Sequence, residues 1–163
     1  MNALTLSQQQ RADALAQRAE DQRAKARAEA EAATLQRTAF ARNIRIWDTN
    51  PMDSSGVNEW QWDIRNANAR PALVFLRWDG GNGMRFFEFD VRPCSEGVLA
   101  IPGIPGEGSG GATFFLTTEI FSDEFWTLDG KAYAEEEFWR TEFGNYEGHL
   151  EPTNVKEGIT PCT

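Results

Sequence analysis

The sequence predicts an α+β protein in which a long, coiled-coil-like N-terminal α-helix is followed by an antiparallel β-sandwich, Ig-like or jelly-roll-like. Residues 1–45 contain 13 alanines but no Gly, Pro, Trp, Tyr or Cys, whereas all 14 glycines, 7 prolines and 6 tryptophans follow Ile46. Residues 1–45 carry eight Lys/Arg and five Asp/Glu (+3) and residues 46–163 carry eight and twenty (−12), which sums to −9. We therefore expect a helix over 1–45, a β-domain over 46–140 and an acidic, Gly- and Pro-containing arm over 141–163.

The helix is predicted over residues 7–43, which are mainly Ala, Gln, Arg and Glu. These are strong helix formers, and their propensities become informative when summed over a long window. Ser7 and Gln10 have the spacing of a capping box, which places the helix start at Ser7. Asp21 and Lys25 are four residues apart in the order that favours an ion pair on the solvent side.

Two repeats describe the apolar positions of this helix. A seven-residue register from Ala12 to Phe40 is apolar at six of nine positions, and an eleven-residue register from Leu15 to Ile44 at seven of nine. Because most of these residues are alanine, each buries little more than a methyl group. Self-association, docking to a protein partner and a solitary solvated helix all stay open. The candidate contact residues on the helix are Leu15, Ala19, Ala26, Ala30, Ala33 and Phe40.

After Ile46 the apolar period changes from that of a helix to that of a strand. Ile44 and Trp47 mark the passage into the first strand, and Trp60, Trp62 and Ile64 share one face of the next. The segment Asp79–Gly83 is a strong hairpin signal. Short strands separated by Gly- and Pro-rich turns indicate a sandwich or barrel. The predicted strands are 57–64, 73–79, 84–91, 97–101, 113–121 and 125–134, the last with a tight turn at residues 129–130.

The order of several motifs carries a resemblance to a known class of proteins. A charged Gln/Ala/Arg helix precedes Ile64-Arg-Asn66-Ala67, Pro71-Ala72-Leu73, a Pro/Gly loop, and Phe121-Ser122-Asp123 leading to Trp126, Gly130 and Tyr133. Over about residues 35–135 this order resembles uncharacterised actinobacterial or actinophage proteins. The resemblance implies an Ig-like domain behind a helical, often membrane-anchored N-terminus, and it implies no catalytic residues. The chain departs from that class because it has no predicted transmembrane segment and has its own acidic tail.

Two segments resemble ligand-binding motifs but lack the flanking elements or residues that those motifs require. The segment Gly106–Gly111 matches Gly-x-Gly-x-x-Gly, but a dinucleotide site requires a preceding strand and a following helix. Here prolines precede it and a strand-like run follows, so we expect a flexible loop. The second pattern is reminiscent of a Ca²⁺ loop but lacks the glycine that an EF-hand requires, so we expect a turn capped by Asp side chains. It consists of Asp48, Asn50, Asp53 and Glu59.

Catalysis is not predicted. His149 is the single histidine and lies in the predicted C-terminal arm, so we expect neither a catalytic triad nor a multi-histidine metal site within one chain. Asp123 with Asp129, or the run Glu135–Glu137, has the residue type of an acid–base pair. Twenty acids in this segment make chance pairs common, and charges also protect sheet edges. We expect no enzyme activity, no cofactor and no metal.

Of the six tryptophans, three are expected in the core and one is a candidate anchor. Trp60, Trp62 and Trp78 alternate with polar residues or lie in apolar strands, so we expect them in the core. Trp139 lies beyond the last clear strand and is the candidate exposed anchor of an interface, with Arg140 beside it.

Compartment and redox state are expectations from the same sequence. No signal peptide or membrane-spanning run is predicted, so we expect cytoplasmic synthesis, with incorporation into a virion or other assembly as one destination. Cys94 and Cys162 allow one disulfide bond, but without an export signal two free thiols are favoured. The acidic charge argues against nucleic acid as a partner.

Together these features predict a non-enzymatic structural or adaptor protein. In this hypothesis the helix assembles with itself or with a protein partner and presents an acidic β-sandwich. The alternative hypothesis is a carbohydrate-binding module tethered by the helix, with an exposed row of tryptophans as its platform.

Overall fold

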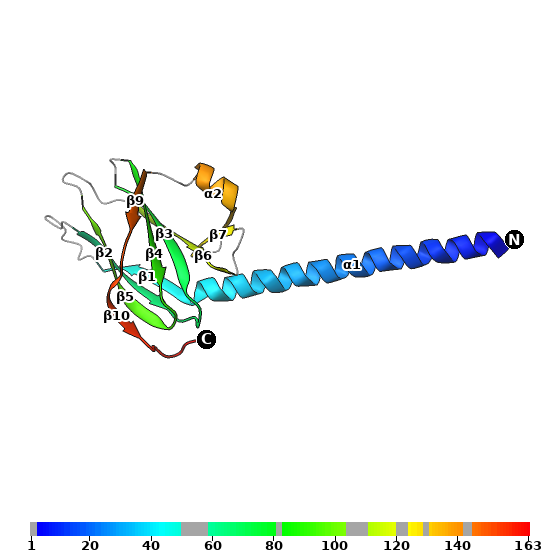
Figure 1. The fold of residues 1–163 in the computed structure, drawn as a ribbon, viewed down its shortest axis with the longest axis horizontal. Helices are drawn as coiled ribbons and strands as arrows, with labels where there is room; N and C mark the ends of the chain where they lie inside the picture. Colours follow the sequence, from blue (N-terminus) through cyan, green and yellow to red (C-terminus); the bar gives the residue numbers. More distant parts are fainter. Residues whose placement is uncertain are drawn as a thin grey trace. The chain divides into compact units, whose positions relative to one another are not determined.

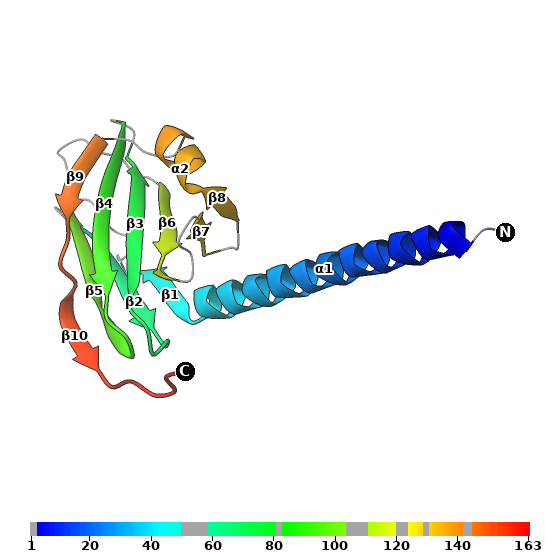
Figure 2. The same ribbon diagram turned by 45° about the vertical axis from the view of Figure 1, so that its right-hand side comes forward.

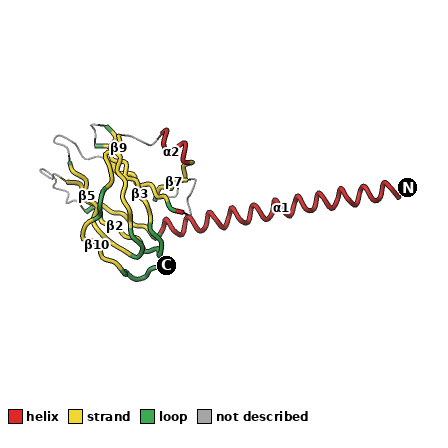
Figure 3. Tube along the Cα trace, in the orientation of Figure 1, coloured by secondary structure: helices red, strands yellow, loops and turns green. Residues whose placement is uncertain are grey.

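The computed structural model describes residues 3–49, 59–80, 83–103, 111–119, 124–128, 131–141 and 145–163, with side chains from Thr5 onward. The chain divides into two compact units, Met1–Arg37 and Thr38–Thr163. Figure 1 labels the helices and strands, and Figure 3 colours them by type. The second unit therefore begins eight residues earlier than the predicted boundary at residue 46, and it includes the last turn of the long helix.

Helix α1 spans Ala3–Arg42 without a break. The predicted end is confirmed to within one residue, but the predicted start at Ser7 is wrong. Ser7 is helical because nothing in the preceding residues stops the helix, and Leu6 is itself a good helix former. The predicted Asp21–Lys25 pair does not form: Gln17 donates to Asp21 at 3.1 Å, and Lys25 lies 3.9 Å from Glu29.

The β-domain is a sandwich of two sheets, which confirms the predicted fold class. The four-stranded sheet has the order β1-β2-β5-β10 and the six-stranded sheet the order β8-β7-β6-β3-β4-β9 (Figure 2). All neighbouring strands are antiparallel except β4 and β9, which are parallel. The strands of the first sheet are β1 (Ile44–Asp48), β2 (Glu59–Asn66), β5 (Ser95–Pro102) and β10 (Thr153–Glu157). Those of the second are β3 (Ala72–Asp79), β4 (Met84–Val91), β6 (Gly111–Thr117), β7 (Glu124–Thr127), β8 (Ala132–Ala134) and β9 (Asn145–His149).

The main core lies between the two sheets. The alternation predicted for β2 is confirmed, because Trp62 and Ile64 are buried and Trp60 is partly buried against the same cluster. Trp78 enters this core from β3, and its ring centroid lies 4.9 Å from that of Trp60. Phe40, from the last turn of α1, is also buried in this core.

A second, aromatic cluster covers the other face of the six-stranded sheet. It is closed by helix α2 (Glu135–Thr141), which lies next to β7 and β8 (Figures 1 and 2). Phe138 is fully buried at its centre, with its ring stacked on Phe125 at 3.9 Å between centroids. Glutamates fill the first turn of α2, where negative charge favours the positive end of the helix dipole. The sequence did not predict this helix.

The described residues 145–163 of the predicted C-terminal arm pair with the β-domain and do not form a free arm. They add an edge strand to each sheet, since β9 pairs with β4 and β10 pairs with β5. The expectation of two free thiols is wrong, because Cys94 and Cys162 form a disulfide bond with their Cα atoms 5.4 Å apart. Beyond β10, the amide of Ile159 donates to the carbonyl of Cys94, and that of Thr163 to the carbonyl of Ala67.

Asparagines join the end of α1 to the turn after β2. Asn68 donates to the carbonyl of Phe40 at 3.1 Å, which satisfies one of the last carbonyls of the helix. Asn43 donates to Asn68 at 3.2 Å and to the Thr163 hydroxyl at 2.9 Å. Asn66 is fully buried, and its side-chain amide donates to the carbonyls of Arg70, Val91 and Arg92. This network explains why the Asn66-Ala67-Asn68 segment has polar residues at buried positions.

Candidate interaction surfaces

The residues considered for metal binding do not come together in the described part of the chain. Asp48 is exposed at the end of β1, Glu59 is the first residue of β2, and Asn50 and Asp53 lie outside the described residues. Among the described residues no three His, Cys, Asp or Glu side chains are placed to hold a metal ion. Of the segment Gly106–Gly111, only Gly111 is described, as the first residue of β6.

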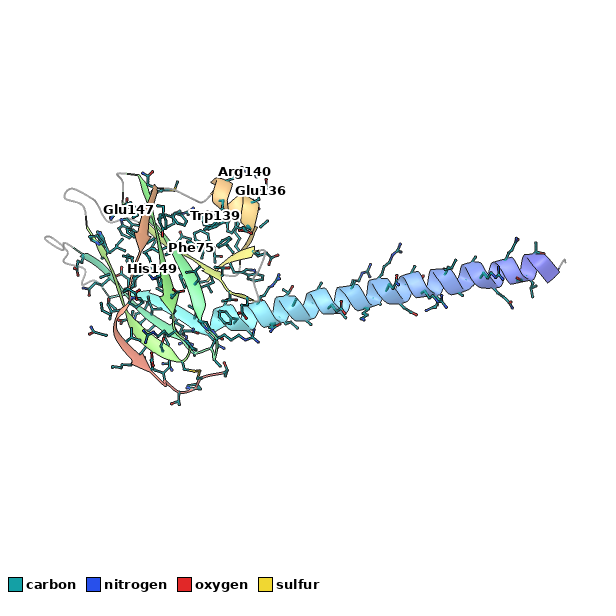
Figure 4. The ribbon with its side chains drawn as sticks, viewed as in Figure 1. Phe75, Glu136, Trp139, Arg140, Glu147 and His149 are labelled. Carbon is teal, nitrogen blue, oxygen red and sulfur yellow. A yellow bond between two sulfur atoms is a disulfide. The ribbon has the colours of Figure 1, made fainter. Side chains whose placement is uncertain are left out.

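The candidate acid–base residues are placed as follows. Asp123 and Asp129 lie outside the described residues, and Glu135–Glu137 are exposed in the first turn of α2. His149 is the last residue of β9 (Figure 4). Its ring nitrogens lie 3.8 Å from Glu88 and 3.4 Å from Glu151.

Tyr146 is joined to the same carboxylate. Its hydroxyl donates to Glu88 at 2.8 Å, and this hydrogen bond, helped by burial and the nearby negative charge, raises the pKa of Tyr146 above its ordinary value. Together with the two contacts of His149, this hydrogen bond forms a surface network of a histidine, a tyrosine and two glutamates at the edge strand β9. The contacts of Tyr146 and His149 with Glu88 link β9 to β4 at the surface, where such contacts contribute little to stability. They do not form a triad, because the groups in contact with His149 are carboxylates.

Helix α1 carries alanine on two opposite faces. With 3.6 residues per turn, the first alanine face includes Leu15 and the second includes Leu35, and both leucines are largely exposed. Every side chain from residue 5 to residue 32 is exposed. Asp21 interrupts the second face at its centre, and Arg23 interrupts the first, between the positions of Ala12 and Ala16 around the helix. The first alanine face consists of Ala12, Leu15, Ala16, Ala19, Ala26, Ala30 and Ala33, and the second of Ala14, Ala24, Ala28, Ala32 and Leu35.

Five of the six predicted contact residues on the helix thus lie together on the first alanine face. The sixth, Phe40, is 6% exposed and belongs to the core of the β-domain, so it is not available to a partner. From the sequence alone, an apolar residue at this position is compatible both with a contact surface of the helix and with the core of the β-domain. Ala41 and Ile44, which complete the eleven-residue register, are buried in the same core, and Ile44 belongs to β1. The surface seam therefore ends before the last turn of α1.

The charged residues of α1 form two flanks between the alanine faces. Residues i and i+2 lie on nearly opposite sides of an α-helix, so they belong to different flanks. The basic flank consists of Arg11, Arg18 and Lys25, with Glu29 as the exception. The acidic flank consists of Asp13, Glu20 and Glu31, with Arg27 as the exception. The two exceptions are themselves two residues apart, and they reverse the sign on both flanks at the same level of the helix.

A second exposed surface lies on α2. Trp139 is 41% exposed, and its ring packs edge-on against Phe75 at 5.7 Å and Phe125 at 5.6 Å (Figure 4). Arg140 beside it is exposed. The predicted exposure of Trp139 is confirmed, and the aromatic cluster beneath holds its ring in place.

Comparison with protein-family models, with curated proteins and with solved structures finds no match to this chain. Neither helix in the described part of the chain combines the length and the apolar character needed to cross a membrane.

Proposed function

We propose that the protein is a non-enzymatic structural or adaptor protein in which α1 associates with α1 of a second copy and presents the acidic β-sandwich. The observation that carries the proposal is the surface of α1, an unbroken helix with an alanine face between a basic and an acidic flank. An isolated helix needs neither the grouped alanines nor the segregated charges. Because alanine side chains are small, two such faces can approach closely and form a helix–helix contact.

The flanks favour a parallel, in-register pair. A twofold axis along two parallel helices brings the basic flank of one copy beside the acidic flank of the other, on both sides of the contact. Arg11 then faces Asp13 of the second copy and Arg18 faces Glu20, so these contacts join opposite charges. At the level of the two exceptions, Lys25 faces Arg27 and Glu29 faces Glu31, so the complementarity is confined to the N-terminal half of α1. An antiparallel pair places flanks of the same sign together.

The expected association is weak and sensitive to salt. At about 0.8 kcal/mol per buried methyl group, the first alanine face of two copies contributes on the order of 10 kcal/mol. The loss of translational and rotational freedom costs about 4–15 kcal/mol. Since these two quantities are similar, the charge pairs decide the balance, and each exposed pair adds only about 0.2–1 kcal/mol.

The decisive experiment is a charge exchange on the full chain, followed by light scattering coupled to size exclusion. We expect Arg11→Glu with Arg18→Glu to weaken the oligomer, and Asp13→Arg with Glu20→Arg to weaken it equally. All four substitutions together restore it, because the flanks are then complementary again. Arg45→Glu on β1 is the control for a charge reversal away from α1. A full chain that is monomeric at every concentration contradicts the proposal, and an oligomer that ignores all four substitutions contradicts the parallel pair.

The domain without the helix is the second control. It should start at Thr38, because a shorter chain beginning at Arg45 lacks Phe40, Ala41 and Ile44 of the core. We expect this shorter protein to be a folded monomer.

A place in a virion or other large particle is the finer part of the proposal. It is supported by analogy, because a long helix joined directly to a compact β-domain is common in fibres and decoration proteins. Kinship with the actinobacterial or actinophage class is proposed on the same footing, and the buried position of Asn66 gives its motif a structural reason. Sedimentation of the protein with purified particles tests this part.

A further inference from the structure

The outer face of the four-stranded sheet carries an exposed tryptophan that the core does not use. Ile44 and Ile46 of β1 pack inward, so the alternation of the strand turns Trp47 outward. Trp47 is 44% exposed, whereas Trp62, Trp78 and Trp126 are buried. The row of exposed tryptophans expected for a carbohydrate-binding module is therefore absent from β2 and β3, and the indole available on this sheet is that of Trp47.

A hollow crosses the sheet beside this indole. Strand pairing places Trp47 opposite Asp63, and Asp63 opposite Val98, so their side chains share the outer face. The hollow has a volume of about 250 Å³. Four polar side chains from three strands line it together with Trp47. They are Asp63, Glu96, Asn154 and Lys156.

The edge strand β10 is irregular beside the hollow. The register of β10 shifts between Thr153 and Lys156, and Asn154 has a φ of 52°, in the left-handed region. A bulge of this kind re-aims a side chain relative to a regular strand. Here the irregular residue is one of those that line the hollow.

We propose that this hollow binds a sugar unit of a neutral polysaccharide. A pyranose ring has an apolar face that fits the exposed indole and a rim of hydroxyl groups that fits the surrounding polar side chains. The carboxylates of Asp63 and Glu96 accept hydrogen bonds from hydroxyls, Lys156 donates them, and Asn154 does both. The charge of −12 on residues 46–163 disfavours polyanionic polysaccharides and nucleic acids. The site uses no residue of α1 and is independent of the assembly proposed above.

The test is affinity electrophoresis and calorimetry of the full chain with a panel of soluble neutral polysaccharides, namely dextran, laminarin, galactomannan and arabinoxylan. We expect binding to at least one of them and at least a tenfold loss in Trp47→Ala. Trp139→Ala is the matched control, because the two tryptophans are almost equally exposed, and we expect it to bind like the unaltered protein. Asp63→Asn, which keeps the shape of the side chain, should weaken binding without changing the melting temperature.

Three results would overturn the assignment. One is the absence of binding to the whole panel by a protein that melts cooperatively. Another is binding that Trp139→Ala loses and Trp47→Ala retains, which moves the site to α2. The third is self-association that Trp47→Ala abolishes, which assigns this face of the sheet to a second copy of the chain.

Discussion

Removing the Cys94–Cys162 disulfide bond tests how the C-terminal residues contribute to stability. The bridge closes a loop between positions 68 residues apart. In the chain-entropy model a 15-residue loop is worth about 3 kcal/mol and a 100-residue loop about 4.7 kcal/mol, so this bond corresponds to about 4 kcal/mol. For domains of this size each kcal/mol lowers the melting temperature by about 2–8 °C. We expect Cys94→Ser with Cys162→Ser to melt on the order of 15 °C below the oxidised protein.

The assay compares four samples by calorimetry: the unaltered protein and the double variant, each with and without a reducing agent. Reduction should lower the melting temperature of the unaltered protein to that of the variant and leave the variant unchanged. Hydrogen exchange supplies a local readout, because the amides of Ile159 and Thr163 bond to residues beside the bridge. A loss of less than about 1 kcal/mol, or two titratable thiols in the protein purified without reductant, refutes the reasoning.

Three further predictions concern single side chains. Asn66→Ala removes a fully buried side chain that donates to the carbonyls of Arg70, Val91 and Arg92, so we expect a loss of about 2–4 kcal/mol in chemical denaturation. Phe138→Ala should cost about 3–5 kcal/mol because its ring is fully buried, whereas the same change at the half-exposed Trp139 should cost clearly less; equal losses would contradict the described cluster. The raised pKa of Tyr146 means that its hydrogen bond stabilises the protein below the ordinary tyrosine pKa and is lost as pH rises through the folded value. Glu88→Ala should lower that pKa in an ultraviolet titration, and an unchanged value would show that the bond does not form.

The sequence predicted the elements that have strong periodic signals. Strand β4 coincides with the predicted 84–91, and the hairpin signal at Asp79–Gly83 is confirmed by the pairing of Asp79 with Met84. The burial of Trp62 followed from strict alternation along β2. In each case one local pattern, read over about eight residues, was enough to determine both the element and its inner face.

The missed elements lack such a pattern. Helix α2 has seven residues, too few for a helical period to stand out, and only Phe138 is fully buried in it. Strands β9 and β10 are exposed along most of their length, so no alternation marks them. The disulfide bond depends on the path of the tail after β10, which brings Cys162 to Cys94 through contacts far apart in sequence.

The candidate surfaces show the same division. Trp139 was found because a large aromatic residue outside any strand has no evident core to join. Trp47 was expected only to mark the start of β1, because its outward direction depends on Ile44 and Ile46 occupying the inner face. The hollow beside it joins residues from four strands and has no signal in any single one of them.

The junction between α1 and the β-domain bears on which function the helix serves. A tether needs a flexible linker, for which Gly- and Ser-rich sequences are suited. Here a single residue, Asn43, separates α1 from β1, and its side chain bonds to Asn68 and Thr163. Phe40 on the helix side of this residue is part of the core, so the end of α1 folds together with the β-domain.

A change that stabilises α1 by self-association therefore also stabilises the β-domain. We accordingly expect the melting temperature of the full chain to rise with protein concentration, and that of the chain starting at Thr38 to stay constant. If the melting temperatures of the two chains depend on protein concentration in the same way, α1 does not mediate assembly.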